Sequence, residues 1–136
     1  MSKHDLDVTL SQMLGYAREV VTLSQGRTRQ DFESDRIYNL AMTRLLEVIG
    51  EAASRVPSDF RAQHPDILWG EVIGLRNRLI HGYDSIDFDI VWQVIAVDLP
   101  KLVADLEKLV YLLPNTRPDT SFTARTGESL SSPMPS

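Results

Sequence analysis

The chain has 136 residues, of which 43% are hydrophobic, and its 14 Lys and Arg against 19 Asp and Glu give a formal net charge of −5. This composition excludes an entirely disordered chain and a protein that coats nucleic acid by bulk charge, and it favours one domain with a substantial core. The absence of cysteine excludes disulfides, thiolate metal sites and thiol nucleophiles. The longest apolar run has five residues, against about 18 for a membrane span. We expect a cytoplasmic protein with no signal peptide and no membrane association.

Apolar residues recur at intervals of three and four, which predicts amphipathic helices over about residues 5–24, 34–55, 66–80 and 87–110. A short helix is expected over 58–63, capped by Ser58, and a turn of helix within 27–35. Gly26 is expected to end the first helix, Asp66 and Asp87 to cap the last two, and Pro100 to bend the last. In the second helix we expect a buried stripe that includes Ile37. No segment alternates with period two, so the predicted fold class is all-α, a four-helix bundle with a short additional helix.

The composition changes at Pro114. Residues 114–136 are rich in Ser, Thr and Pro, with only scattered apolar residues. Such a segment cannot bury enough surface to offset the entropy cost of ordering. We therefore expect a helical domain over residues 1–113 and a disordered C-terminal tail over 114–136.

One segment concentrates side chains that carry chemistry: Arg76, Asn77, Arg78, His81 and Tyr83 fall within eight positions of an otherwise acidic chain. On a helix, Asn77 and His81 share a face, whereas Arg76 and His81 diverge by about 140°. Several interpretations stay open. The cations could be solvated helix-face charges, with His81 near a helix C-terminus. A long arginine could reach round the helix, the motif could extend beyond the helix end, or two copies could meet across a two-fold axis and form one cleft.

These residues resemble the signature of the HepT-type toxins of the HEPN superfamily, in which an Arg is followed after four to six residues by a His. The segment Arg76-Asn77-Arg78-Leu79-Ile80-His81 has this form, and Gly82-Tyr83 matches the x-Tyr that follows in the HepT subgroup. Further similar phrases occur in the expected order over residues 5–112: Ile49 to Pro57, Pro65 to Trp69, Asp87 with Trp92, and Asp98-Leu99-Pro100.

The resemblance implies a HEPN-type bundle that dimerises and acts as a metal-independent endoribonuclease at the homodimer interface, with no cofactor. It also implies that the chain is the toxin of a type VII toxin–antitoxin pair. The partner would be a MntA-type minimal nucleotidyltransferase antitoxin, which silences the toxin by transferring AMP to the motif tyrosine, here Tyr83.

In such an enzyme we expect His81 to act as general base or acid while an RNA 2′-hydroxyl attacks the adjacent phosphorus. Arg76 would hold the scissile phosphate through paired N–H donors. Asn77 would orient His81, donate to phosphate or serve only as a structural cap, and Arg78 would contact flanking phosphates of the RNA. Two alternatives remain: a non-catalytic HEPN companion that binds a nucleotidyltransferase, and a structural dimer in which the motif serves only packing.

Overall fold

The structure, a computed structural model, describes residues 1–80 and 87–112 of the chain. All regular elements in this part are helical, which confirms the predicted all-α class. In chain order they are α1 (Lys3–Ser24), α2 (Arg29–Ser34), α3 (Arg36–Ser54), α4 (Ser58–Gln63), α5 (Trp69–Ile73), α6 (Leu75–Ile80), α7 (Phe88–Gln93), the π-turn η1 (Val94–Asp98) and α8 (Leu99–Leu112).

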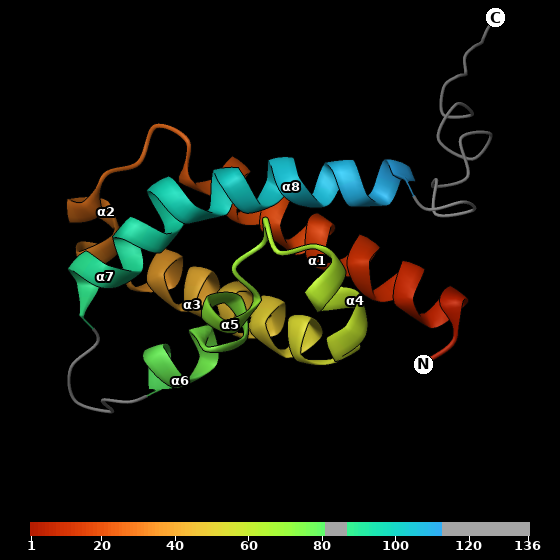
Figure 1. The fold of residues 1–136 in the computed structure, drawn as a ribbon. Coiled ribbons are helices and arrows are strands. Elements are labelled where there is room, and N and C mark those ends of the chain that lie inside the picture. The colour runs from red at the N-terminus through yellow and green to blue at the C-terminus, as the bar shows by residue number, and fades with distance from the viewer. Residues whose placement is uncertain (81–86, 113–136) are drawn as a thin grey trace, which may run out of the picture.

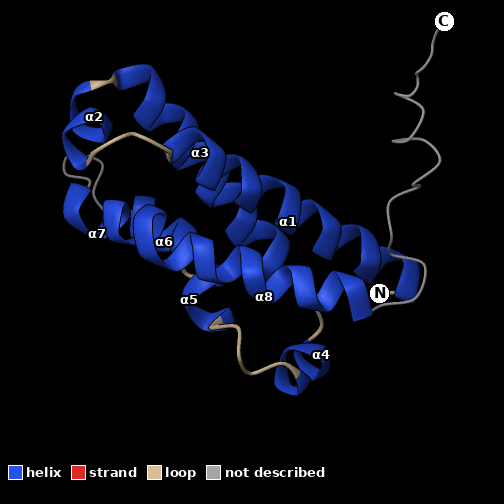
Figure 2. Cartoon of the chain, turned by 90° about the horizontal axis from the view of Figure 1, so that it is seen from above, coloured by secondary structure: helices blue, strands red, loops and turns tan. Residues whose placement is uncertain are grey.

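The long helices run back and forth along one axis. Helix α1 packs against α3 on one side and α8 on the other, and α5 and α6 lie against α3 (Figure 1). Helices α7 and α8 follow one another through η1 and return along α1. Helix α4 is set apart from the long helices, with loops on both sides (Figure 2). The architecture is therefore the expected four-helix bundle, with the third helix broken into α5 and α6 and with two short additional helices, α2 and α4.

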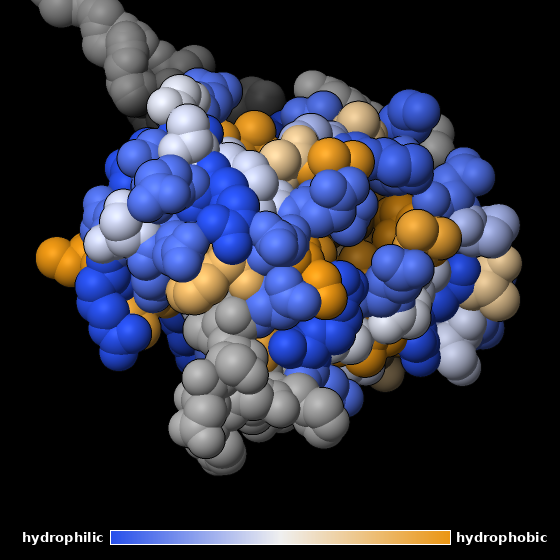
Figure 3. All heavy atoms as spheres, turned by 90° about the vertical axis from the view of Figure 1, so that its left-hand side faces the viewer, coloured by the Kyte–Doolittle hydropathy of each residue, from blue (hydrophilic) through white to orange (hydrophobic). Residues whose placement is uncertain are grey.

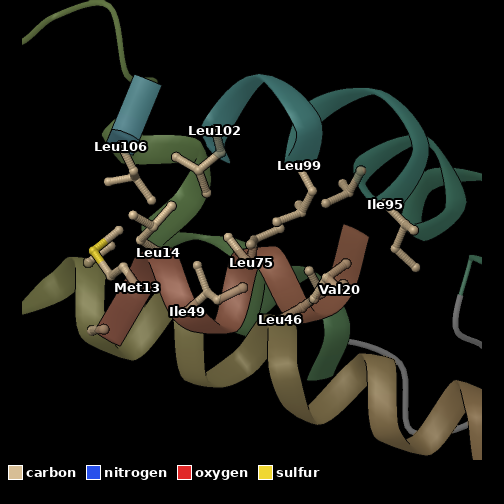
Figure 4. Packing of buried hydrophobic residues seen from close by; sticks show 14 of the residues in the cluster. Met13, Leu14, Val20, Leu46, Ile49, Leu75, Ile95, Leu99, Leu102 and Leu106 are labelled. Carbon is tan, nitrogen blue, oxygen red and sulfur yellow. The ribbon is translucent and has the colours of Figure 1, made fainter. Parts of the chain in front are cut away.

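The core lies where the helices of the bundle face one another. Side chains from α1, α3, α6, η1 and α8 point toward a common centre (Figure 4). Each fully buried aliphatic side chain of this kind stabilises the fold by about 1.5–3 kcal/mol relative to exposure. The largest side chains that are fully buried are those of Phe32, Leu10, Met13, Met42, Leu46, Ile49, Ile95, Leu99 and Leu106.

Local sequence signals set most helix ends. Ser2 and Asp5 form a reciprocal capping box at the start of α1, and Thr28 and Asp31 form another at the start of α2. The Asp35 side chain accepts from the backbone N–H of Tyr38 and so caps α3. Gly26 follows the end of α1 with a φ of 74°, the left-handed conformation that glycine adopts without a Cβ penalty. The predicted role of Gly26 is confirmed.

The predicted buried face of α3 is partly wrong. Ile37 is 81% exposed and Leu40 is 51% exposed, whereas Met42 and Leu46 are fully buried. The reason is helical phase. Ile37 is seven residues from Arg44, so both share a face, and Arg44 is exposed and pairs with Glu47. The face that packs on α1 is instead the one without charged residues.

Two expected caps in the middle of the chain are also wrong. Pro57 rather than Ser58 occupies the cap position of α4, and no side chain caps that helix. Asp66 does not cap the next helix, because residues 64–69 first form a turn in which Ile67 N–H donates to His64 and Trp69 N–H donates to Ile67. Helix α5 therefore begins only at Trp69. Its N-cap residue is Leu68, whose side chain makes no capping hydrogen bond.

Asp87 caps α7 as predicted, accepting from the backbone N–H groups of Asp89 and Ile90. The expected distortion near Pro100 takes the form of η1, in which Leu99 N–H donates to the Val94 carbonyl, five residues back. Proline has no N–H for the preceding turn, and a π-turn accommodates that missing donor without ending the helix.

Candidate functional site

Helix α6 carries the Arg-Asn-Arg part of the motif. Two leucines anchor it on α3: Leu75 is 4% exposed and Leu79 is 6% exposed. Because these leucines are four residues apart and face the core, Asn77 lies on the opposite side of the helix, and both Asn77 and Arg78 are exposed. The sequence thus forms a short amphipathic helix that buries its leucines and presents Asn77 and Arg78 to solvent.

Arg76 is also part of α6, and its position is about 200° around the helix from that of Arg78. The two arginines therefore occupy different flanks of one short helix. Helix α6 ends at Ile80, directly before the motif histidine. His81, Gly82 and Tyr83 lie outside the described residues, so the pairing of Arg76 with His81 stays a prediction.

Two grooves border α6 on the side of Arg78. The first, which we call the α6–α7 groove, has an empty volume of about 610 Å³ and is lined by Leu46, Leu79, Asp87, Ile90 and Arg78, among others. The second, the α5–α8 groove, has an empty volume of about 500 Å³ and is lined by Leu68, Val72, Leu75, Leu99, Leu102 and Arg78, among others. Seen from the end where α2 and α7 lie, the surface is mainly polar, and apolar side chains show through at a hollow (Figure 3).

The exposed guanidinium of Arg78 forms no ion pair within the described residues, and the same is true of Arg36. In contrast, Arg18, Arg27, Arg29 and Arg44 each contact a carboxylate. An exposed cation that no carboxylate neutralises is available to an anionic ligand. Among the predicted site residues that the structure describes with their side chains, Arg78 is thus the one best placed to contact a phosphate.

Both ends of the segment between α6 and α7 are held by other helices. Helix α7 is docked on α2, where the buried ring of Phe32 lies edge-on to Phe88, with centroids 5.6 Å apart. Arg29 of α2 also donates to Asp89, and this hydrogen bond raises the pKa of Arg29 above its usual value. This role of α2 was not predicted from the sequence. The signal was present in the capping box of Thr28 and Asp31, followed at once by Phe32.

The remaining two histidines lie away from α6. His4 is exposed in the first turn of α1, and the half-buried ring of His64 lies 4.4 Å from that of Phe60. Within residues 1–80 and 87–112, no three acidic, histidine or cysteine side chains are grouped closely enough to hold a metal ion. No helix in the same part of the chain is long and apolar enough to cross a membrane.

Comparison with known families decides what kind of protein carries this helix. A model of the ribonuclease HepT-like family matches residues 13–109. The chain belongs to this family. It is therefore a ribonuclease of the HEPN type, which confirms the enzyme class predicted from the sequence. The match covers every helix from the middle of α1 to the last turns of α8.

Similar proteins with related names occur in archaea and bacteria. A "Putative RNase" of Methanocaldococcus jannaschii is 36% identical over 107 residues, which are 79% of this chain and 98% of the relative. A "Probable ribonuclease HepT" of Thermococcus cleftensis is 38% identical over 95 residues, or 67% of this chain and 86% of the relative. A "Putative RNase" of Caldanaerobacter subterraneus is 31% identical over 101 residues, or 74% and 90%. No solved structure matches the chain significantly.

Proposed function

We propose that this HepT-like ribonuclease is the toxin of a type VII toxin–antitoxin pair and cuts RNA with Arg76 and His81. The observation that carries the proposal is the place of the motif in a HepT-like chain: Arg76 lies on α6, and His81 follows the last residue of that helix. The relatives named as ribonucleases align over most of their own length, which supports the same chemistry in this chain.

The proposed reaction is an internal transesterification. His81 accepts the proton of an RNA 2′-hydroxyl, or returns a proton to the leaving group, since an imidazole titrates near pH ~6.5. The 2′-oxygen attacks the adjacent phosphorus, and the bond from phosphorus to the 5′-oxygen breaks. The products are a 2′,3′-cyclic phosphate and a free 5′-hydroxyl. Arg76 holds the phosphate with paired N–H donors and stabilises the negative charge that develops on its oxygens.

Asn77 and Arg78 support this chemistry from the exposed side of α6. Arg78 contacts phosphates that flank the cut, because it is exposed and makes no ion pair among the described residues. Asn77 orients His81 or donates to phosphate. The proposed enzyme is a homodimer, in which two copies of α6 approach one another and bring two arginines and two histidines into one cleft. This arrangement supplies positive charge to RNA within an acidic chain.

The proposed regulation is covalent. A MntA-type nucleotidyltransferase antitoxin transfers AMP to the hydroxyl of Tyr83, two residues after His81. The attached AMP adds bulk and negative charge beside Arg76 and His81, where the RNA phosphate would bind. Intact-mass measurement after co-expression with that partner, followed by peptide mapping, tests this step. An adduct on any residue other than Tyr83 would disprove it.

The catalytic proposal is tested by RNA cleavage with two variants and two matched controls. His81→Ala and Arg76→Ala should each abolish cleavage and growth inhibition while the protein keeps its helical content and oligomeric state. The controls are His4→Ala and Arg36→Ala, which remove the same side-chain types at exposed positions without a hydrogen bond to a described residue. Both controls should cut RNA at the native rate.

The alternative of a non-catalytic companion makes the opposite prediction. In that case the native protein would bind a nucleotidyltransferase tightly, would cut no RNA and would not slow growth. DNA of the same base sequence is a further control, because it lacks the 2′-hydroxyl and should remain intact. If His81→Ala cuts as well as the native protein, the proposed site is wrong.

A further inference from the structure

Apart from Arg78 in its lining, the α5–α8 groove has no role in the reaction proposed above. Its floor is apolar and comes from elements that are far apart in sequence, with Val72 and Leu75 on one side and Leu99 and Leu102 on the other. At its edge Leu68 is 59% exposed, although it is a large aliphatic residue. An apolar floor with an exposed leucine at its mouth is typical of a surface that another polypeptide covers.

The groove lies along the one irregular turn of the α7–α8 helix. Val94 and Asp98, the first and last residues of η1, both line it. Turns of this π type occur mostly as single insertions in α-helices and often mark functional sites. Here the turn carries a carboxylate to the groove directly before Leu99 of the floor.

Charge at the mouth distinguishes between possible ligands. Lys101 is already satisfied, since its ammonium nitrogen lies 2.6 Å from the Asp105 carboxylate and 3.1 Å from the Asp66 carbonyl oxygen. Glu71 of α5 and Asp98 of η1 are both exposed and have no ion pair within residues 1–80 and 87–112. The lining also includes the exposed Arg78, so the lining side chains without an ion pair in the described residues are two carboxylates and one guanidinium. This balance favours basic side chains over a polyanion such as RNA.

We propose that the α5–α8 groove is the docking site for an amphipathic, basic segment of a protein partner. Aliphatic side chains at helical spacing would enter the groove, and flanking Lys or Arg residues would meet Glu71 and Asp98. We take this partner to be the nucleotidyltransferase, an identity that rests on the proposed function. Leu75 and Arg78 of α6 also line the groove, so a segment bound there contacts the helix that carries Arg76. Docking thus brings the partner beside the motif.

Two groove variants test the proposal with the intact nucleotidyltransferase as the probe. Leu68→Asn removes the apolar side chain at the mouth without adding a charge, and position 68 is the N-cap of α5, where Asn is favoured. The double variant Glu71→Lys, Asp98→Lys reverses the charge of both walls. In isothermal titration calorimetry, each should weaken partner binding by about tenfold or more. Native binding should also weaken as salt is raised, because the walls and the partner carry opposite charges.

Each variant has a matched control. Ile37→Asn changes another exposed aliphatic residue near the start of a helix, and Glu19→Lys reverses another exposed carboxylate without an ion pair to a described residue. Neither position lines the groove. Both controls should bind the partner within about twofold of the native chain. Urea unfolding of all variants confirms that they remain folded.

The outcomes separate this inference from the proposed function. If the groove variants bind the partner as the native chain does, docking at the groove is wrong, and the proposed function stands. If the native chain binds no nucleotidyltransferase, both the partner and the groove assignment fail. If the variants change RNA affinity or the oligomeric state while partner binding is unchanged, the occupant is RNA or a second copy of the chain, and the proposal is overturned.

Discussion

The indole nitrogen of Trp69 donates a hydrogen bond to the backbone carbonyl oxygen of His64, at 2.9 Å. This bond closes the turn that precedes α5, a helix of five residues without a side-chain cap. Trp69 is buried, so its ring anchors the turn in the core while its nitrogen fixes the backbone. Because α6 follows α5 after Gly74, the same contact fixes where the motif helix begins.

We expect Trp69→Phe to lower the free energy of unfolding by more than about 0.5–1.5 kcal/mol, because it removes one hydrogen bond and also part of a buried ring. His64→Ala is the control, because the acceptor is a backbone atom that this substitution keeps. The loss of unfolding free energy in His64→Ala should be smaller and should come only from the contact between His64 and Phe60. Urea unfolding measures both. Equal losses would show that the hydrogen bond contributes nothing.

The substitution Arg78→Ala should weaken RNA binding more than it slows the chemical step. Loss of one phosphate contact should raise KM by about tenfold, with a smaller change in kcat. The slope of log KM against log salt should also fall by about 0.7, the value for one phosphate of a single strand. Arg36→Ala, at another exposed arginine, should leave both quantities unchanged. An unaltered salt slope in Arg78→Ala would remove Arg78 from the RNA-binding surface.

Two glycines in helical segments should respond differently to alanine. A Cβ at Gly15 of α1 meets nothing within 4 Å, so Gly15→Ala should stabilise the fold by about 0.5–1 kcal/mol. At Gly74 a Cβ would lie 3.1 Å from the Gly70 carbonyl oxygen, which also accepts the Gly74 N–H. Gly74→Ala should therefore stabilise the fold less than Gly15→Ala does, or destabilise it. Equal gains in urea unfolding would show that the junction of α5 and α6 adapts freely.

The cap of α3 predicts a dependence of stability on pH. The N–H of Tyr38 donates to the Asp35 carboxylate, and this bond, assisted by the Arg27 guanidinium, lowers the pKa of Asp35 below its usual 3.8. The contribution of Asp35 is therefore complete above pH 3.8 and is lost as the pH falls through the lowered pKa. Asp35→Asn keeps an acceptor but does not titrate.

The stability difference between the native chain and Asp35→Asn should accordingly be constant from pH 5 to 7, and it should shrink below pH ~3.8. Thermal unfolding across this pH range measures the difference. A difference that stays constant in acid would show that the Asp35 carboxylate is not perturbed by folding.

Much of the fold follows from local signals in the sequence. The apolar period predicts α1, α3 and α8, and Gly26 and Asp87 mark boundaries that the structure confirms. The exposed face of α3 was not predicted, because Ile37 fits an apolar stripe as well as Met42 does. The sequence signal that favours the Met42 stripe is the charge of Arg44, which lies on the same helix face as Ile37.

The site was predictable as a motif but not as a surface. Arg76 and Arg78 stand out by their charge in an acidic chain, with Asn77 between them. In the structure all three residues lie on α6. The two grooves beside Arg78 bring α6 together with later residues of the chain, those of α7 and η1 in one groove and those of η1 and α8 in the other. No spacing rule in the sequence connects those segments. The role of α2 in holding α7 through Phe32 was hidden for the same reason.

The π-turn before Pro100 makes the number of residues in this stretch as important as their identity. Helix α7 packs on α2, whereas α8 packs on α1, so two different faces must be presented by one nearly continuous rod. Inserting one residue within η1 would rotate every later side chain by about 100° and turn Leu102 and Leu106 away from the interior, whereas deleting one residue would convert the π-turn into regular α-helix and keep their faces. One-residue insertions should therefore be rejected here.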